Sequence, residues 1–446
     1  MSLLKGAGAS LEAAKERYLA SFAQRDAQGE TPWSSKLRQA ALDSFAAQGF
    51  PSTRNEEWKY TDVRPIAELD AQTASTQGLN GLATGGGQAF NFGELQTHRL
   101  VFVNGRMAPQ LSQIHELPNG VTLGSLAEHI AGGSELVQEH LGRYAVQTAP
   151  SPFTDLNTAF MQDGVFLHVP NGIEIETPIH LLFLSQPGEG ATVAYPRNLI
   201  IVGASSRVTL IEHYASTHGG EYFTNTVTEI IAGKNANIDH YKLQLESEAA
   251  FHVSTTQVQQ ERDVHFASHM FDFGGRLVRN NSNAVMGGEN IECTLNGLYL
   301  IDGKQHVDNH TAMDHAQPHC NSYEVYTGVL SGQSRGVFNG KIFVRRDAQK
   351  TDAKQSNRNL LLSTDALVNT KPQLEIFADD VRCTHGATIG QLDEDAEFYL
   401  RARGISKEDA RGLLVYAFAN EVLNGVRLEP LRAFLEQQIF TRLAQR

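Results

Sequence analysis

The central part of this sequence repeats a short pattern roughly every 30 residues, and this repetition limits the folds open to the chain. In each copy a glycine or polar turn precedes a segment in which apolar and polar residues alternate. Alternation with a period of two predicts a strand, because successive side chains of a strand point to opposite faces. A unit of this kind cannot bury its own apolar face, so the units must stack. The first apolar residues of the copies are Val208, Ile238, Val264, Ile291, Val307 and Val337.

Residues 151–390 form the core of the predicted fold, which is mainly β. A β-sandwich or barrel and a parallel β-helix are both compatible with a long series of strands and turns. The repeat spacing favours the parallel β-helix. So does the scarcity of the Asn-Gly and Asp-Gly turns that join hairpins, with Asn339-Gly340 and Asp302-Gly303 as exceptions.

Helical regions are predicted on both sides of this core. Residues 1–150 are expected to be mostly helical, with a mobile linker at about 70–96 that is rich in Gly, Ala, Gln, Ser and Thr. Residues 391–446 are expected to form a C-terminal helical domain. Apolar residues on its helices either pack against the chain itself or form a docking surface for a partner: Leu414, Phe418, Leu431, Phe434 and Leu435.

Charge and cysteine content exclude several classes of protein. The 446 residues include 37 basic and 50 acidic side chains, a net charge of −13, which argues against a general nucleic-acid-binding protein. No apolar run approaches the ~20 residues that span a bilayer, and the N-terminus has no apolar signal segment. The three cysteines, Cys293, Cys320 and Cys383, are too few for a disulfide framework. We therefore expect a cytoplasmic protein.

The densest group of possible metal ligands lies within 306–320. It contains His306, His310, His315, His319 and Cys320, and imidazole and thiolate groups bind transition metals. On a strand, His306, Asp308 and His310 project to one side and Val307 to the other. The spacing matches no common zinc motif, so a hydrogen-bonded polar surface is the alternative to a metal site.

A second candidate site is the pair Cys383 and His385, which closes the repeated region. On a strand the two side chains share a face, roughly 6–7 Å apart. They could bind iron or an iron–sulfur cluster, act as a Cys/His nucleophile pair, or include only a buried structural cysteine. Because the last unit of a stack leaves a sheet end that must be covered or paired, we expect this pair to lie at an interface.

ATP-binding and hydrolase motifs are not found. The segments 297–304 and 336–341 do not have the glycine spacing of a phosphate-binding loop, and no Gly-x-Ser-x-Gly occurs. The sequence therefore gives no indication of ATP chemistry in this chain.

Five motifs give the chain a specific resemblance. The segment Arg54-x-Glu-Glu-Trp-Lys-Tyr-Thr61 resembles the N-terminal signature of the SufB/SufD family of iron–sulfur cluster assembly proteins. Four further segments resemble the C-terminal core of this family, at 336–342, 355–363, 371–376 and 380–388. Because no cysteine precedes Cys293, the chain is more similar to the SufD members than to the SufB members.

This resemblance implies a right-handed parallel β-helix and a non-catalytic role in the SUF system. It implies pairing with SufB through the β-helix ends and binding of the ATPase SufC by the C-terminal helices. It also implies that His385, with Cys383 beside it, contributes to a transient cluster or iron site at the interface with SufB. We expect no tightly bound cofactor in the isolated chain, and that chain could form a homodimer through its exposed last turn.

Two other functions are compatible with the composition. Parallel β-helices also occur in polysaccharide lyases and hydrolases, although the chain has no signal for export. A stand-alone metal-binding protein could use the histidines and cysteine within 306–320.

Overall fold

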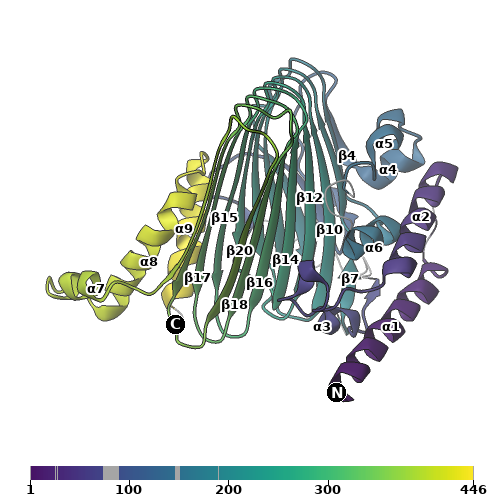
Figure 1. Ribbon diagram of the computed structural model, residues 1–446. Helices are drawn as coiled ribbons and strands as arrows, with labels where there is room; N and C mark the ends of the chain where they lie inside the picture. The colour runs from purple at the N-terminus through teal and green to yellow at the C-terminus, as the bar shows by residue number, and fades with distance from the viewer. Residues whose placement is uncertain are drawn as a thin grey trace.

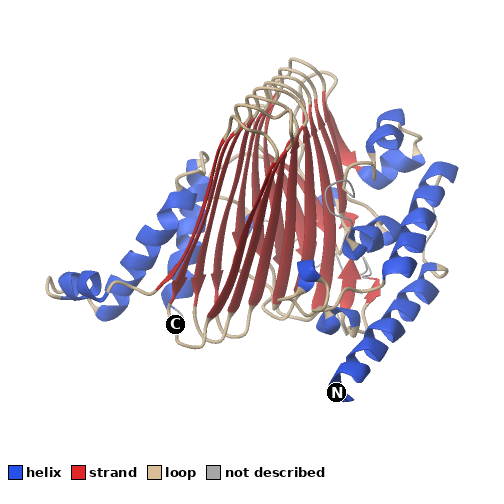
Figure 2. Cartoon of the chain, in the orientation of Figure 1, coloured by secondary structure: helices blue, strands red, loops and turns tan. Residues whose placement is uncertain are grey.

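The computed structural model of the chain describes residues 2–25, 27, 29–73, 90–145, 151–188 and 190–444. A tall stack of two sheets forms its centre, with N-terminal helices on one side and C-terminal helices on the other (Figure 1; Figure 2). The prediction of a parallel β-helix between helical regions is therefore confirmed. Most of the predicted linker, at 74–89, lies outside the described residues.

From β8 onward the chain alternates between the two sheets, so strands that are neighbours within one sheet are separated in sequence by a strand of the other. Sheet A consists of β1 (Gln72–Thr73), β4 (Thr122–Ser125), β5 (Val165–Val169), β7 (Thr192–Ala194), β8 (Arg197–Val202), β10 (Tyr222–Ala232), β12 (Phe251–Gln260), β14 (Leu277–Met286), β16 (His306–His315), β18 (Arg335–Val344) and β20 (Leu367–Ile376). Sheet B consists of β2 (His98–Val103), β3 (Arg106–Met107), β6 (Ile179–Ser185), β9 (Arg207–Ser216), β11 (Asn237–Leu245), β13 (His265–Asp272), β15 (Glu292–Ile301), β17 (Asn321–Leu330), β19 (Asp352–Leu361) and β21 (Arg382–Gly390).

Helices cover the outer faces of both sheets (Figure 1). The N-terminal part contains α1 (Ser2–Phe22), α2 (Pro32–Gln48), α3 (Arg64–Ala67), α4 (Leu126–Ala131), α5 (Glu135–His140) and α6 (Pro152–Phe160). The C-terminal part contains α7 (Glu394–Arg401), α8 (Lys407–Leu423) and α9 (Glu429–Ala444). Ser406 is the N-cap of α8, where its side chain accepts a hydrogen bond from the Asp409 amide at 3.0 Å.

The turns from sheet A to sheet B keep the stack in register. One residue in each of six turns has a positive φ, between 56° and 63°: Ser205, Asn235, Asp263, Asn290, His319 and Lys350. Each of these residues donates its amide to a carbonyl of the following turn, as Ser205 does to Lys234 at 2.7 Å and His319 does to Gln349 at 2.9 Å. Asn and Asp tolerate this backbone conformation better than most residues. The repeated polar turn of the sequence is therefore a ladder of backbone hydrogen bonds.

The alignment of repeats made from the sequence is wrong after Ile238. Val208 and Ile238 are partners on sheet B, but the next members of that column are Phe266 and Cys293. Val307 and Val337 belong to sheet A. Because strands of both sheets carry the same alternation, the hydropathy pattern does not distinguish one sheet from the other.

The stack begins before residue 151. Strand β2 pairs in parallel with β6, and β4 pairs antiparallel with β5. Two short helices, α4 and α5, lie between β4 and β5, and Gly132 and Gly133 separate them. The first turns of the β-helix are therefore completed by the N-terminal region.

Candidate functional site

Cys383 and His385 lie on β21, the last strand of sheet B. In the β19–β21 ladder Ala353 is opposite Cys383, and Gln355 is opposite His385. Ala353 belongs to the apolar interior, and Cys383 packs against that interior. Since side chains two apart share a face, His385 lies on the same face as Cys383, at the open end of the stack.

The last turn of the stack is exposed along both of its strands. All of β21 except the half-buried Cys383 is exposed, and most of β20 is only half-buried. Within the described ranges each of these strands has a sheet partner on one side only, which leaves the backbone donors and acceptors of its other edge without a strand partner there. Four apolar side chains in or beside this turn are more than a third exposed: Leu367 (46%), Ile376 (39%), Phe377 (59%) and Ile389 (48%).

The chemistry of Cys383 is that of a thiol. Partial burial, with a smaller contribution from Asp352, raises the pKa of Cys383 above its ordinary value. Across the described part of the chain, no hydrogen bond joins Cys383 to His385. An activated Cys/His nucleophile pair needs a lowered thiol pKa and such a contact. The described contacts therefore do not support an activated Cys/His nucleophile pair.

The structure separates the possible metal ligands within 306–320. His306 and His310 face outward from sheet A, on the side opposite Val307 as predicted. His315 and Cys320 are buried inside the stack, where burial lowers the pKa of His315 to about 4 and raises that of Cys320. His319 is one of the positive-φ turn residues. Across the described ranges no group of three or more His, Cys, Asp or Glu side chains is placed to hold one metal ion.

The outward histidines form part of a clamp that fastens the N-terminal region to sheet A. We call residues 56–61 the N-terminal clamp. Its Trp58 is 6% exposed, and the Arg279 guanidinium lies over its ring at 4.3 Å. Arg279 also donates to the Glu57 carbonyl at 2.9 Å and to Asp308 at 2.6 Å.

Charged partners complete the clamp. The two ring nitrogens of His310 lie 3.3 Å from Glu57 and 3.0 Å from Asp308. Burial alone would raise the pKa of Asp308, but Arg279 and His310 hold it well below the ordinary range. His306 and His310 therefore belong to a hydrogen-bonded polar surface. The signature segment at 54–61 contacts this surface and fastens the N-terminal region to sheet A.

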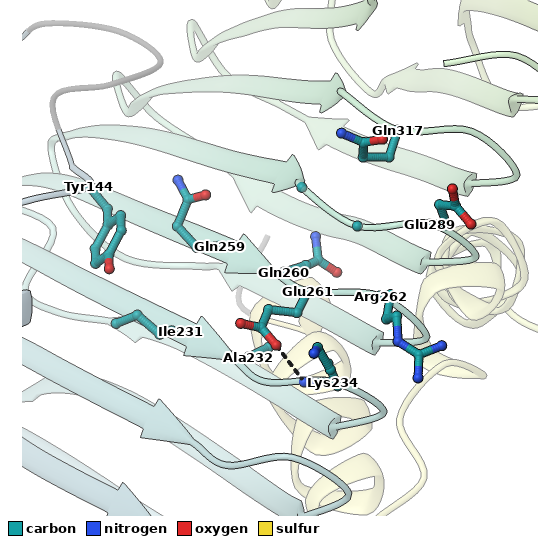
Figure 3. Close-up of a pocket in the computed structure, with 12 residues that line it drawn as sticks. Tyr144, Ile231, Ala232, Lys234, Gln259, Gln260, Glu261, Arg262, Glu289 and Gln317 are labelled. Carbon is teal, nitrogen blue, oxygen red and sulfur yellow. Dashed lines mark hydrogen bonds between the residues drawn. The ribbon is translucent and has the colours of Figure 1, made fainter. Parts of the chain in front are cut away.

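A groove on the outer face of sheet A does not bring its charged side chains together at one point. It has a volume of about 530 Å³ and is lined by Tyr144, Lys234, Glu261, Arg262 and Glu289 among others (Figure 3). The Lys234 amide donates to Glu261 at 3.2 Å, and the charged side chains of both signs spread along the turns. This arrangement offers no paired acid and base and no common metal position.

The apolar residues proposed for partner docking fall into two groups. Leu431 and Leu435 are fully buried and belong to the same apolar cluster as Ile211 and Leu243 of sheet B. Phe434 packs on Phe92, with ring centroids 5.1 Å apart. Leu414 and Phe418 line a groove of about 360 Å³ between α8 and the last turn of the stack.

A buried polar pair lies directly below His385, and sequence reasoning missed it. The Gln355 amide nitrogen donates to Glu324 at 2.7 Å, with both side chains facing the interior. Burial, the main effect, raises the pKa of Glu324 to about 7. The sequence alone does not show that these two polar residues lie on the inner face, because that depends on the pairing of β17 with β19.

The fold and the site together define a stacked β-helix protein whose open last turn presents a thiol and an imidazole beside exposed strand edges. Comparison with known proteins identifies the family to which this fold belongs. The family described as "SUF system FeS cluster assembly, SufBD core domain" matches residues 183–418, and "SufBD protein N-terminal region" matches residues 12–181. The chain belongs to the SufBD family of iron–sulfur cluster assembly proteins.

Relatives support this assignment over almost the whole length of the chain. An iron–sulfur cluster assembly SufBD family protein of Synechocystis sp. is 35% identical, with 91% of this chain and 90% of the relative covered. The iron–sulfur cluster assembly protein SufD of Escherichia coli is 32% identical, with 92% of each chain covered. SufD of Bacillus subtilis is 26% identical over 94% of this chain and 95% of its own. The resemblance to SufD members is therefore confirmed.

None of the described helices is both long and apolar enough to cross a membrane.

Proposed function

We propose that this chain is a non-catalytic subunit of a SUF scaffold, which pairs with SufB through the open end of its β-helix. The observation that carries the proposal is the last turn itself, where Cys383 and His385 lie on the exposed final strand of sheet B, beyond which no other described strand pairs. Unpaired strand edges and exposed apolar side chains are the usual features of a pairing surface. When SufB is absent, a second copy of the chain covers the same surface.

His385 contributes one ligand to iron or to the nascent cluster at that interface, with Cys383 as a second candidate. Imidazole and thiolate are both common ligands of iron–sulfur sites. Two side chains do not complete a coordination sphere, so SufB supplies the remaining ligands. The cluster is the product that passes through the site, and the isolated chain holds no tightly bound cofactor.

The C-terminal helices dock the ATPase SufC. On α7, Phe398 is 73% exposed and Tyr399 is 57% exposed, and Leu413 of α8 is 44% exposed. Exposed apolar groups of this size on adjacent helices are typical of a protein interface. Leu414 and Phe418 remain candidates at the edge of this surface, whereas Leu431 and Leu435 stabilise the helices against sheet B.

The chain connects the two surfaces directly. Strand β21 ends at Gly390, and Asp393 is already the N-cap of α7. A movement of α7 that follows nucleotide binding to SufC therefore acts on the strand that carries His385. Differential contacts of SufC in its two nucleotide states supply the free energy that opens the interface with SufB.

Reconstitution of clusters tests the proposal. His385→Ala, in a complex with SufB and SufC, should lower cluster formation from iron and sulfide while the complex still assembles. His265→Ala is the matched control, because His265 is a half-exposed histidine on an earlier strand of the same sheet. Full cluster yield from the His385 variant would remove His385 from the mechanism.

The docking of SufC has a separate test. Phe398→Ala combined with Tyr399→Ala should reduce binding of SufC and leave pairing with SufB unchanged, because both rings lie on α7, away from β20 and β21. Unchanged SufC binding would place the ATPase elsewhere on the chain.

A further inference from the structure

We propose that Gln355 is a positioning residue for His385: its carboxamide oxygen accepts a hydrogen bond from one ring N–H of His385 and so directs the other ring nitrogen outward to the incoming metal. This inference rests on the proposed role of His385 and adds to it the residue that sets its orientation. Metal-binding histidines usually donate their second ring nitrogen to an oxygen in this way.

The register brings the two side chains together. Gln355 and His385 are direct partners in the parallel ladder of β19 and β21, and neighbouring strands lie about 4.8 Å apart. Gln355 is 3% exposed, whereas His385 is exposed on the last strand. The amide therefore lies at the bottom of the site, and the imidazole lies between it and the open end.

The orientation of the Gln355 amide is fixed from below. Its nitrogen donates to Glu324 at 2.7 Å, and Glu324 is 1% exposed. This contact assigns the nitrogen to the interior and leaves the carboxamide oxygen free to face another group. The oxygen is buried and has no hydrogen-bond partner among the described residues. A buried carbonyl oxygen without a donor is costly, and an imidazole N–H one strand above would satisfy it.

Gly340 on the facing strand β18 provides the space for this amide. A Cβ atom at Gly340 would lie 2.3 Å from the Gln355 amide nitrogen and 2.7 Å from a ring carbon of Phe338. The facing position must therefore be glycine if the amide is to remain where it is. Gly340 offers a way to displace the amide without any change to β19 or β21.

The tautomer of His385 provides the first test. In protein with ring-¹⁵N-labelled histidine, the His385 signals are identified by their loss in His385→Ala. The parent should show one dominant tautomer, because one ring nitrogen is held by Gln355. Gln355→Met, which keeps the length of the side chain and removes the acceptor, should shift these signals toward a mixed population.

Cluster assembly provides the second readout. Gln355→Met in the complex with SufB and SufC should slow cluster formation roughly tenfold, the usual cost of losing such a hydrogen bond. Gly340→Ala should produce both effects through displacement of the amide, and it decides the question if Gln355→Met fails to fold. Gln373→Met is the matched control, since it makes the same change on the outer side of the other terminal strand.

The outcomes separate this inference from the proposed function. Unchanged His385 ring-nitrogen shifts in folded Gln355→Met, or in folded Gly340→Ala, would overturn the role of Gln355 even if His385→Ala abolishes cluster formation. Full cluster yield from His385→Ala would instead overturn the proposed function, and the tautomer measurement would still report whether the hydrogen bond exists.

Discussion

Replacement of the buried Glu324 by glutamine should stabilise the protein at neutral and alkaline pH. Burial raises the pKa of this carboxyl from 4.5 to about 7. Between these two pH values the folded chain keeps a proton that the unfolded chain has lost, so the free energy of unfolding decreases as the pH rises. Below pH 4.5 both states are protonated, and above pH 7 the decrease is complete.

The size of the effect follows from the width of this window. A shift of about 2.5 pH units, at 1.36 kcal/mol per unit, corresponds to about 3 kcal/mol. Glu324→Gln has no charge to ionise and can still accept the hydrogen bond from Gln355. The variant and the parent should therefore have similar stability at pH 4.5, and the variant should be about 3 kcal/mol more stable at pH 8.

Urea unfolding at several pH values between 4.5 and 8 measures this difference. All other titrating groups are common to both proteins, so they cancel when the two free energies of unfolding are subtracted. Glu176→Gln removes the same charge from an exposed position and should show no rise across this range. A stability difference between Glu324→Gln and the parent that does not change with pH would refute the assignment of a raised pKa to Glu324.

Two contacts of the N-terminal region give further predictions. Trp58→Ala removes the ring that lies under Arg279 and packs on Phe153, and it should lower the free energy of unfolding by about 3–5 kcal/mol, measured by urea unfolding; a loss below about 1 kcal/mol would show that the clamp does not stabilise the fold. Glu229→Ala leaves the fully buried Arg197 without its partner at 2.6 Å and releases the amides of Gly142, Tyr144 and Ala145. It should cost about 3–5 kcal/mol and increase hydrogen exchange at 142–145, and unchanged exchange would contradict this role.

The stack could be predicted from the sequence because its turns and its alternation repeat. The turn residues, such as Asn235 and Asn290, belong to a local pattern that each copy carries by itself. The position of Cys383 and His385 at the end followed from the same pattern, since the alternation stops after Gly390. These features depend only on residues that are close together in the sequence, so they can be recognised without a structure.

The interior could not be predicted in the same way. In a two-sided stack that is covered by helices, both faces of a strand are buried, so a polar residue in the alternation does not indicate solvent. Glu212 and Lys242 are each 1% exposed, inside the stack. Burial alone would raise the pKa of Glu212, yet the hydrogen bond from His240, with Lys242 nearby, lowers it to about 2. Such polar residues can lie inside because they form hydrogen bonds and ion pairs with one another. Their partners are distant in sequence, so the sequence alone does not reveal them.

The two ends of the stack differ in a way that explains where the candidate site lies. At the first end, β3 pairs antiparallel with β2 and β4 with β5, and α4 packs over the neighbouring strands. At the last end, no other described strand pairs with the outer edges of β20 and β21, and the chain leaves at once into α7. A stable isolated protein would not retain a long exposed edge without a reason, because such edges promote aggregation. In the proposed function this end opens and closes to release a cluster, which a permanently capped end could not do, and the last turn of the stack meets that requirement.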